Sequence, residues 1–348
     1  MSLTMFSALL PYFGCKRNLS AVIFKQIASH IPRERWKDMV FVDAFLGSGA
    51  VSLYAKAHGF KIVCNDIAER SYLAGKALVE NNDTHIRDED VQRLFIPNED
   101  DNKHFIERSY VPDIFPRKHA AFLDRAFANA NTPLFRYLLV KYIFHIRPYS
   151  KFTSPNAFNI PFSEGRFDEI KPTYTKHIRE NLSSPLSIAY LQRDKINSGI
   201  FSNGKKNEVY KQDVFSFIKN VTGDILYLDP PYAGTLAYEK EYEPIDIILG
   251  EGSRPKSRFS SKNGMDELDS LLAEAGHFPY WVISFGNAAG KNDFNKLRKM
   301  ISKYRTVEAI EFSYTHCAAM ATEKHKKQCK EWMIIAGDII ARPKGKAE

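Results

Sequence analysis

The residues Asp229-Pro230-Pro231-Tyr232 place a carboxylate, two rigid prolines and an aromatic ring directly after the apolar segment 225–228. Neither proline carries an amide N–H, so the Asp229 carboxylate and the Pro230 carbonyl can form a surface made only of hydrogen-bond acceptors. Two acceptors suit the two N–H groups of an exocyclic amine, and the Tyr232 ring can stack on a flat base. The pattern predicts a pocket for an amino-bearing base that has left its duplex. The plain alternative is a strand that ends at prolines beside a surface aspartate.

A second candidate site is the glycine-containing turn Asp43-Ala44-Phe45-Leu46-Gly47-Ser48-Gly49. A glycine turn that ends a strand and opens a helix lets a ligand approach the backbone closely. Ser52 replaces the third glycine of the dinucleotide-binding pattern, so the pyrophosphate cradle is incomplete. Asp66, expected at the tip of the next strand, can accept hydrogen bonds from ribose hydroxyls. These features favour a nucleoside ligand without a pyrophosphate, although a tight turn and a surface aspartate give the same pattern.

The elements that must position these residues alternate between strand and helix. Leu19, Ile23 and Ile27 recur at helical spacing, which predicts a helix with Asn18 or Ser20 as N-cap and Pro32 as terminator. Further helices are predicted at 51–57, 69–80 and 265–275, and strands at 39–45, 61–64, 208–212, 225–228, 280–285, 306–312 and 331–337. This alternation predicts a parallel sheet.

The strand–helix pattern is interrupted between residues 88 and 205. Within this stretch, residues 103–153 hold nine Lys or Arg, three Asp or Glu and eleven aromatic residues. We therefore predict an α/β domain formed by residues 1–87 and 206–348, with a mainly helical domain inserted at 88–205. Because apolar helix faces need large side chains, its aromatic residues are expected to fill a core. They are Phe122, Phe127, Phe135, Tyr137, Tyr142 and Phe144.

Composition limits the classes of protein that the chain can represent. Of its 348 residues, 44% are hydrophobic and 26% charged, which is ordinary for a globular protein and excludes a disordered or collagen-like chain. No apolar run reaches the ~18 residues of a membrane helix, and no secretory signal is visible. The net charge of +8 suits a polyanionic partner. Four scattered cysteines indicate reduced thiols, so a cytoplasmic location is expected.

Four segments resemble, in order, motifs of the D12 class of adenine-N6-specific DNA methyltransferases, the Dam-like α group. They are Pro11-Tyr12-Phe13-Gly14-Cys15-Lys16, the turn Asp43 to Gly49, Asn65-Asp66, and Asp229 to Tyr232. Weaker matches occur at 158–162, 212–215 and 283–287. Cys15 stands where the family usually has a second glycine.

The resemblance implies a Rossmann-like, S-adenosylmethionine-dependent methyltransferase sheet with an inserted DNA-recognition domain. The implied reaction transfers methyl from S-adenosylmethionine (SAM) to N6 of a flipped-out adenine in duplex DNA. Asp229, Pro230, Pro231 and Tyr232 are the expected catalytic residues. The expected cofactor residues are Tyr12, Lys16, Asp43, Phe45, Gly47, Ser48, Gly49, Asp66, Ile67, Asp213 and Val214. A monomer that binds duplex DNA is expected, and a cognate restriction endonuclease is a partner that the resemblance allows.

Basic residues in two regions are candidates for phosphate contacts. Those of the insertion are Arg125, Arg136, Lys141, Arg147 and Lys151, and those of the loop after the catalytic turn are Arg254, Lys256, Arg258 and Lys262. The loop is either a solvated surface segment or a flap over DNA. A set formed by His316, Cys317, His325 and Cys329 matches no zinc spacing, so no metal is expected.

Several alternatives stay open on sequence grounds. The same chemistry could modify RNA adenine, cytosine N4 or protein glutamine, and the Asp at position 229 and the basic insertion favour DNA adenine. A non-catalytic DNA-binding module would have lost Asp229 or the glycine turn, and both are present. Ser52 disfavours a nucleotide oxidoreductase.

Overall fold

The computed structural model describes residues 3–11, 14–146, 159–231, 238–252, 257–287, 292–313 and 330–337. The chain forms two compact units, which we treat separately. Unit 1 comprises Met1–Tyr12, Lys76–Ser202 and Tyr238–Arg254, and unit 2 comprises Phe13–Gly75, Asn203–Ala237 and Pro255–Glu348. Unit 1 thus contains most of the predicted insertion together with residues 1–12, 76–87 and 238–254 from outside it. The assignment of catalysis and recognition to separate domains stays a prediction.

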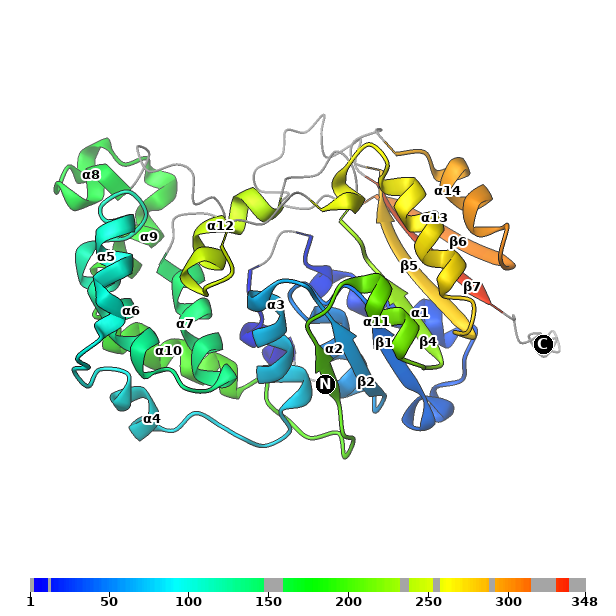
Figure 1. Ribbon diagram of the computed structural model, residues 1–348, viewed down its shortest axis with the longest axis horizontal. Helices are drawn as coiled ribbons and strands as arrows, with labels where there is room; N and C mark the ends of the chain where they lie inside the picture. The colour runs from blue at the N-terminus through cyan, green and yellow to red at the C-terminus, as the bar shows by residue number, and fades with distance from the viewer. Residues whose placement is uncertain are drawn as a thin grey trace, which may run out of the picture. The chain divides into compact units, whose positions relative to one another are not determined.

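Unit 2 is built on a seven-stranded sheet with the order β3-β2-β1-β4-β5-β7-β6 (Figure 1). The strands are β1 Val40–Asp43, β2 Lys61–Asn65, β3 Glu208–Tyr210, β4 Ile225–Leu228, β5 Tyr280–Gly286, β6 Val307–Ser313 and β7 Lys330–Gly337. All seven predicted strands are therefore confirmed. Strands β1 to β5 pair in parallel, as expected, whereas β7 runs antiparallel to both β5 and β6. The prediction of a parallel sheet therefore does not extend to β7.

Alternate residues of the strands form two apolar faces, because successive side chains of a strand point to opposite sides. On one face, Leu226 of β4 and Ile283 of β5 share a buried cluster with apolar side chains of three helices. These helices are α11 Val214–Asn220, α13 Gly264–Glu274 and α14 Phe294–Ile301. On the other face, the Phe24 ring lies 5.5 Å from that of Phe41, and the Phe41 ring lies 6.0 Å from that of Tyr227. The sheet is thus the buried middle layer of unit 2.

Four helices of unit 2 or its boundary follow the predictions closely. Helix α1 is Ser20–Ala28, α2 is Ala50–Ala57, and α13 has the bounds given above. The predicted helix 69–80 consists of α3 Glu69–Ala74 followed by the π-helical turn Gly75–Glu80. The predicted cap of α1 is wrong, because Leu19 occupies the N-cap position without a side-chain hydrogen bond. The helix also ends four residues before Pro32. The helical period of the apolar residues located α1 correctly, although its cap did not follow from residue type.

The described residues of unit 1 form helices and no strand. They include α4 Asp88–Arg93, α5 Phe105–Tyr110, α6 Arg117–Asn129, α7 Pro133–Ile146, α8 Asn159–Ser163, α9 Thr175–Leu182, α10 Pro185–Asn197 and α12 Tyr238–Ile248. Of the six aromatic residues expected in its core, Phe122, Tyr137, Tyr142 and Phe144 are buried, whereas Phe127 and Phe135 are half-buried. No described helix has the length and apolar character needed to cross a membrane.

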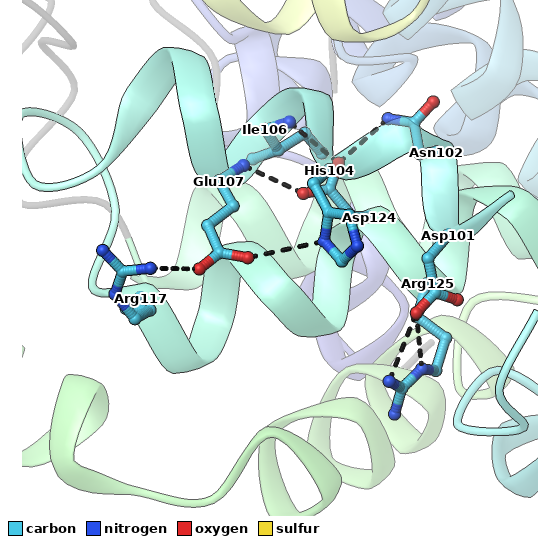
Figure 2. Close-up of polar contacts among 8 residues, drawn as sticks. All are labelled: Asp101, Asn102, His104, Ile106, Glu107, Arg117, Asp124 and Arg125. Atoms are coloured by element: carbon cyan, nitrogen blue, oxygen red, sulfur yellow. Dashed lines mark hydrogen bonds and ion pairs between the residues drawn. The ribbon is translucent and has the colours of Figure 1, made fainter.

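A buried carboxylate organises the start of α5 in unit 1. Asp124 of α6 accepts hydrogen bonds from the amides of Ile106 and Glu107 at 2.8 and 2.9 Å, and from the Asn102 side chain at 3.1 Å (Figure 2). Asp124 therefore caps α5 from a neighbouring helix, where the first amides lack partners of their own. The adjacent Arg125 pairs with Asp101 at 3.2 Å, so this candidate phosphate contact has an acidic partner within unit 1.

Candidate active site

Three predicted acidic residues lie at one edge of the unit 2 sheet. Asp43 ends β1, Asp66 follows β2 and Asp229 follows β4. Two backbone hydrogen bonds join the strand ends at this edge. Ala44 N, after β1, donates to Tyr227 O of β4 at 3.1 Å, and Leu46 N donates to Asn65 O of β2 at 2.9 Å. Ligands of open α/β sheets bind at this edge, beyond the carboxyl ends of the parallel strands. The fold therefore brings together the glycine turn, Asp66 and the start of the Asp-Pro-Pro segment.

The glycine turn and Asp66 are held together by hydrogen bonds. Asp66 accepts from Gly47 N at 2.8 Å through Oδ2 and from Ala68 N at 2.9 Å through Oδ1. Gly47 and Gly49 have φ values of 54° and 79°, in the left-handed region that glycine adopts without a Cβ clash. Burial raises the pKa of Asp66, and the two amide hydrogen bonds oppose this rise. Ile67, directly after it, is 57% exposed and offers an apolar surface beside the acid.

Asp43 is buried beneath the same turn. Its Oδ2 accepts from the Ser52 hydroxyl at 2.7 Å, and its Oδ1 accepts from Phe45 N at 3.3 Å. Burial raises the pKa of Asp43 to about 7, and the negative charges of Asp229 and Asp66 add to this rise. Sequence reasoning treated Ser52 only as a departure from a glycine pattern and missed its bond to Asp43. A small polar residue between the apolar Val51 and Leu53 was the available signal.

The Asp229 carboxylate lies against a buried lysine. Lys16 Nζ is 2.8 Å from Asp229 Oδ1 and 3.2 Å from Glu331 Oε1. Lys16 is 4% exposed and Glu331 is 1% exposed. The sequence predicted Lys16 near the cofactor, and the structure places its ammonium on Asp229. Glu331 was missed as a site residue, although a charge at the start of the apolar strand β7 was a visible signal.

Aromatic rings and a capped helix border the glycine turn. The Phe259 ring lies 5.2 Å from that of Phe45 and 6.2 Å from that of Phe215. Asp213 caps α11 by accepting from Phe215 N at 3.0 Å, and the next residue, Val214, is buried. The Arg258 guanidinium lies 5.1 Å from the centroid of the Phe215 ring and 3.6 Å from Asp213. These contacts bring Phe45, Asp213 and Arg258 together around the rings of Phe215 and Phe259.

Ser48, Pro230 and Pro231 are the remaining predicted residues that the structure describes near Asp229 and the glycine turn. The Ser48 hydroxyl lies 3.1 Å from the Cys15 sulfur, which connects the turn to the segment before Lys16. Pro230 is buried and Pro231 is half-buried. Seven predicted residues or sets lie outside the described residues, namely Tyr12, Tyr232, Arg147, Lys151, Arg254, Lys256 and the set His316, Cys317, His325 and Cys329.

Two basic candidates of unit 1 turn inward. Lys141 is 5% exposed and donates to Leu9 O at 2.9 Å, so the expectation that it meets phosphate is wrong. Arg136 is half-buried and donates to Leu249 O at 3.1 Å, just beyond the end of α12. Its contact with DNA stays a prediction. In the part of the chain that the structure describes, no group of three His, Cys, Asp or Glu side chains could hold a metal ion.

Comparison with known proteins identifies the family of the chain. Residues 12–270 match the model of the D12 class N6 adenine-specific DNA methyltransferases. The chain is 28% identical over 335 residues to the type II methyltransferase M2.HphI of Haemophilus parahaemolyticus, covering 91% of this chain and 94% of the relative. It is 25% identical over 335 residues to the type II methyltransferase M.NlaIII of Neisseria lactamica, covering 90% and 94%. The chain belongs to the D12 class of N6 adenine-specific DNA methyltransferases.

Proposed function

We propose that this chain is a site-specific adenine DNA methyltransferase that transfers methyl from SAM to N6 of a flipped-out adenine in duplex DNA. The observation that carries the proposal is the position of Asp229 and the buried Pro230 at the same sheet edge as the Gly47–Asp66 hydrogen bond. One edge thereby holds both acceptors for an exocyclic amine and a turn for a nucleoside. The relatives are named type II methyltransferases, which supports a role beside a cognate restriction endonuclease.

The chemistry of the side chains at this edge fits SAM. Asp66 is a half-buried carboxylate beside the glycine turn and can accept from ribose hydroxyls. The exposed Ile67 can cover one face of the cofactor adenine, and the Asp213–Val214 segment lies at the next strand end. Asp43 supplies a second carboxylate for a cationic ligand. When bound, SAM supplies an electrophilic methyl group on a sulfonium, which requires neither a metal nor a covalent enzyme intermediate.

Asp229 and Pro230 act on the amine that receives the methyl group. The N6 lone pair of adenine is delocalised into the ring and is therefore a weak nucleophile. Hydrogen bonds from its two N–H groups to the Asp229 carboxylate and the Pro230 carbonyl favour a tetrahedral nitrogen with a localised lone pair. The carboxylate also stabilises the positive charge that develops on this nitrogen. The proline rings restrict the backbone at both acceptors, because Pro230 cannot rotate about φ and the residue before a proline is confined to extended conformations.

Cofactor and DNA binding are proposed for the residues expected from the sequence. The proposed cofactor set is Tyr12, Lys16, Asp43, Phe45, Gly47, Ser48, Gly49, Asp66, Ile67, Asp213 and Val214, of which all but Tyr12 belong to unit 2. The proposed phosphate contacts are Arg136, Arg147, Lys151, Arg254, Lys256 and Arg258. We also propose that the protein acts as a monomer in the cytoplasm.

Tritium transfer from labelled SAM tests the proposed reaction. The wild-type chain should label duplex DNA and not RNA of the same sequence, and sequencing should locate the methyl groups on adenine N6 at one recurring site. Asp229→Ala should abolish transfer, because loss of one well-placed acceptor costs ~3 kcal/mol or more. Label in RNA alone, or wild-type turnover by the Asp229 variant, would contradict the proposal.

A further inference from the structure

The Lys16 ammonium is shared between two carboxylates that come from distant parts of unit 2. It lies 2.8 Å from Asp229 Oδ1, 3.2 Å from Glu331 Oε1 and 3.4 Å from the Gly14 carbonyl. The side chains of Lys16 and Glu331 are 3% and 2% exposed, and that of Asp229 is 17% exposed. Solvent therefore screens the two buried members weakly, so the ion pairs that they form are strong.

The reversed direction of β7 explains why Glu331 can reach this place. Glu331 is opposite Gly286 at the end of β5 and opposite Phe312 near the end of β6. Because β7 is antiparallel to β5, its amino end lies at the edge where the parallel strands have their carboxyl ends. A parallel strand would place its first residues at the opposite edge. The reversal thus delivers a buried carboxylate to the lysine that contacts Asp229.

The number of charges matters for the proposed methyl transfer. A lysine paired with Asp229 alone would form a neutral pair, which would attract a developing cation weakly. Glu331 adds a second negative charge, so that the three groups together carry one excess negative charge. A positive charge that develops on the target amine then meets an environment of opposite sign, held in place before the reaction.

We propose that Glu331 is a positioning residue for methyl transfer, an inference that rests on the proposed function. It holds the Lys16 ammonium between two carboxylates and so preserves the negative charge and acceptor strength of Asp229. Glu331 touches neither substrate nor cofactor in this scheme. Its effect passes through Lys16 to the acceptor that binds the amine.

Two substitutions of Glu331 separate charge from packing. Glu331→Gln keeps the shape of the side chain and removes its charge, whereas Glu331→Asp keeps the charge and shortens the side chain. If charge is what matters, single-turnover methylation should fall about tenfold or more in the Gln variant, a smaller effect than the ~10²–10³ expected for direct acceptor loss. The Asp variant should keep its rate within about threefold of wild type. A purely structural role predicts that the Asp variant methylates more slowly than the Gln variant, because Gln fits the site and Asp leaves a gap.

The matched control is Glu311→Gln on β6. Glu311 is also next to β7, where it pairs with Lys330 and accepts from Trp332 Nε1 at 2.7 Å, but its side chain is 37% exposed. This control should methylate at the wild-type rate. Affinity for S-adenosylhomocysteine, measured by calorimetry, should stay within about threefold of wild type in Glu331→Asp and in the control, because both keep the negative charge beside Lys16, which belongs to the proposed cofactor set.

The wild type and Asp229→Ala are assayed beside these variants, so that the two ideas can fail separately. Methyl transfer by the wild type and none by Asp229→Ala supports the proposed function whatever the Glu331 variants do. In that case, a wild-type rate in Glu331→Gln, or an equal loss in both Glu331 variants, overturns the inference. If Glu331→Gln does not fold, a loss of more than tenfold in a folded Glu331→Asp overturns it. No transfer to DNA by the wild type overturns the proposed function and this inference together.

Discussion

Replacement of Asp43 by Asn should make unit 2 more stable at high pH. Burial raises the pKa of Asp43 from its ordinary value of 3.8 to about 7. Between these values the folded chain keeps a proton that the unfolded chain has released, so ionisation lowers stability as the pH rises through this window. At 1.36 kcal/mol per pKa unit, the cost above pH 7 is up to about 4 kcal/mol. Asp43→Asn removes this cost and keeps an oxygen for the Ser52 hydroxyl.

Urea unfolding followed by tryptophan fluorescence can measure this difference. The three tryptophans are Trp36, Trp281 and Trp332, and all belong to unit 2, so the signal reports on the unit that contains Asp43. The stability of Asp43→Asn relative to wild type should increase between pH 4 and pH 7 and level off above about pH 8. A stability difference that is equal at pH 5 and pH 8 would refute the reasoning, because it would show that Asp43 is ionised at both values.

The same carboxyl should make cofactor affinity depend on pH. A cationic ligand beside Asp43 favours the ionised form, so binding of SAM should strengthen between about pH 6 and pH 8, by at most tenfold per pH unit. S-adenosylhomocysteine lacks the sulfonium charge and should show a weaker dependence, and Asp43→Asn should show none with either ligand. Calorimetric titration at three pH values checks this, and a pH-independent affinity for SAM in the wild type would speak against a cationic group near Asp43.

Three further predictions concern the cofactor, the helical unit and DNA. Asp66→Ala should weaken binding of S-adenosylhomocysteine by ~1–3 kcal/mol in calorimetry, since ribose hydroxyls lose an acceptor; equal affinity would show that the ribose binds elsewhere. Asp124→Ala should destabilise unit 1 by about 2–4 kcal/mol in urea unfolding followed by circular dichroism, because three donors lose their acceptor; a cost below about 1 kcal/mol would contradict its role as a cap. Replacement of Arg147 and Lys151 by Gln should reduce the slope of log affinity against log salt by ~0.9 per lost phosphate contact, at unchanged cofactor affinity. An unchanged slope would direct the search to the loop around Arg258.

The strands and the sheet-edge acids could be predicted because their signals are local. An apolar run before a glycine turn or before Pro230 defines where a strand ends, and parallel strands bring those ends together. The partners of these residues are not local. Nothing near Lys16 in the sequence indicates Glu331, since the contact depends on the direction of β7, and strand direction follows from how the chain connects rather than from residue type.

The sequence also did not show whether a basic side chain on a helix points toward the core or toward solvent. Lys141 and Arg125 are as basic as any neighbour, but Lys141 donates to a carbonyl in the core of unit 1 and Arg125 pairs with Asp101. Helix α7 is buried on most sides, so its period does not separate an inner from an outer face. A count of basic residues therefore overestimates the number that can meet DNA.

The charged group of Lys16, Asp229 and Glu331 is completed only late in the synthesis of the chain. Lys16 is near the start of the chain, while Glu331 lies on the last described strand. At about 5–20 residues per second, a ribosome needs about 15–60 s to pass from the first to the last of them. The glycine turn and Asp66 are complete early in that interval. A nascent or prematurely released chain can therefore contain the glycine turn while it still lacks Glu331 of β7. In such a chain Lys16 can pair with Asp229 but not with the second carboxylate.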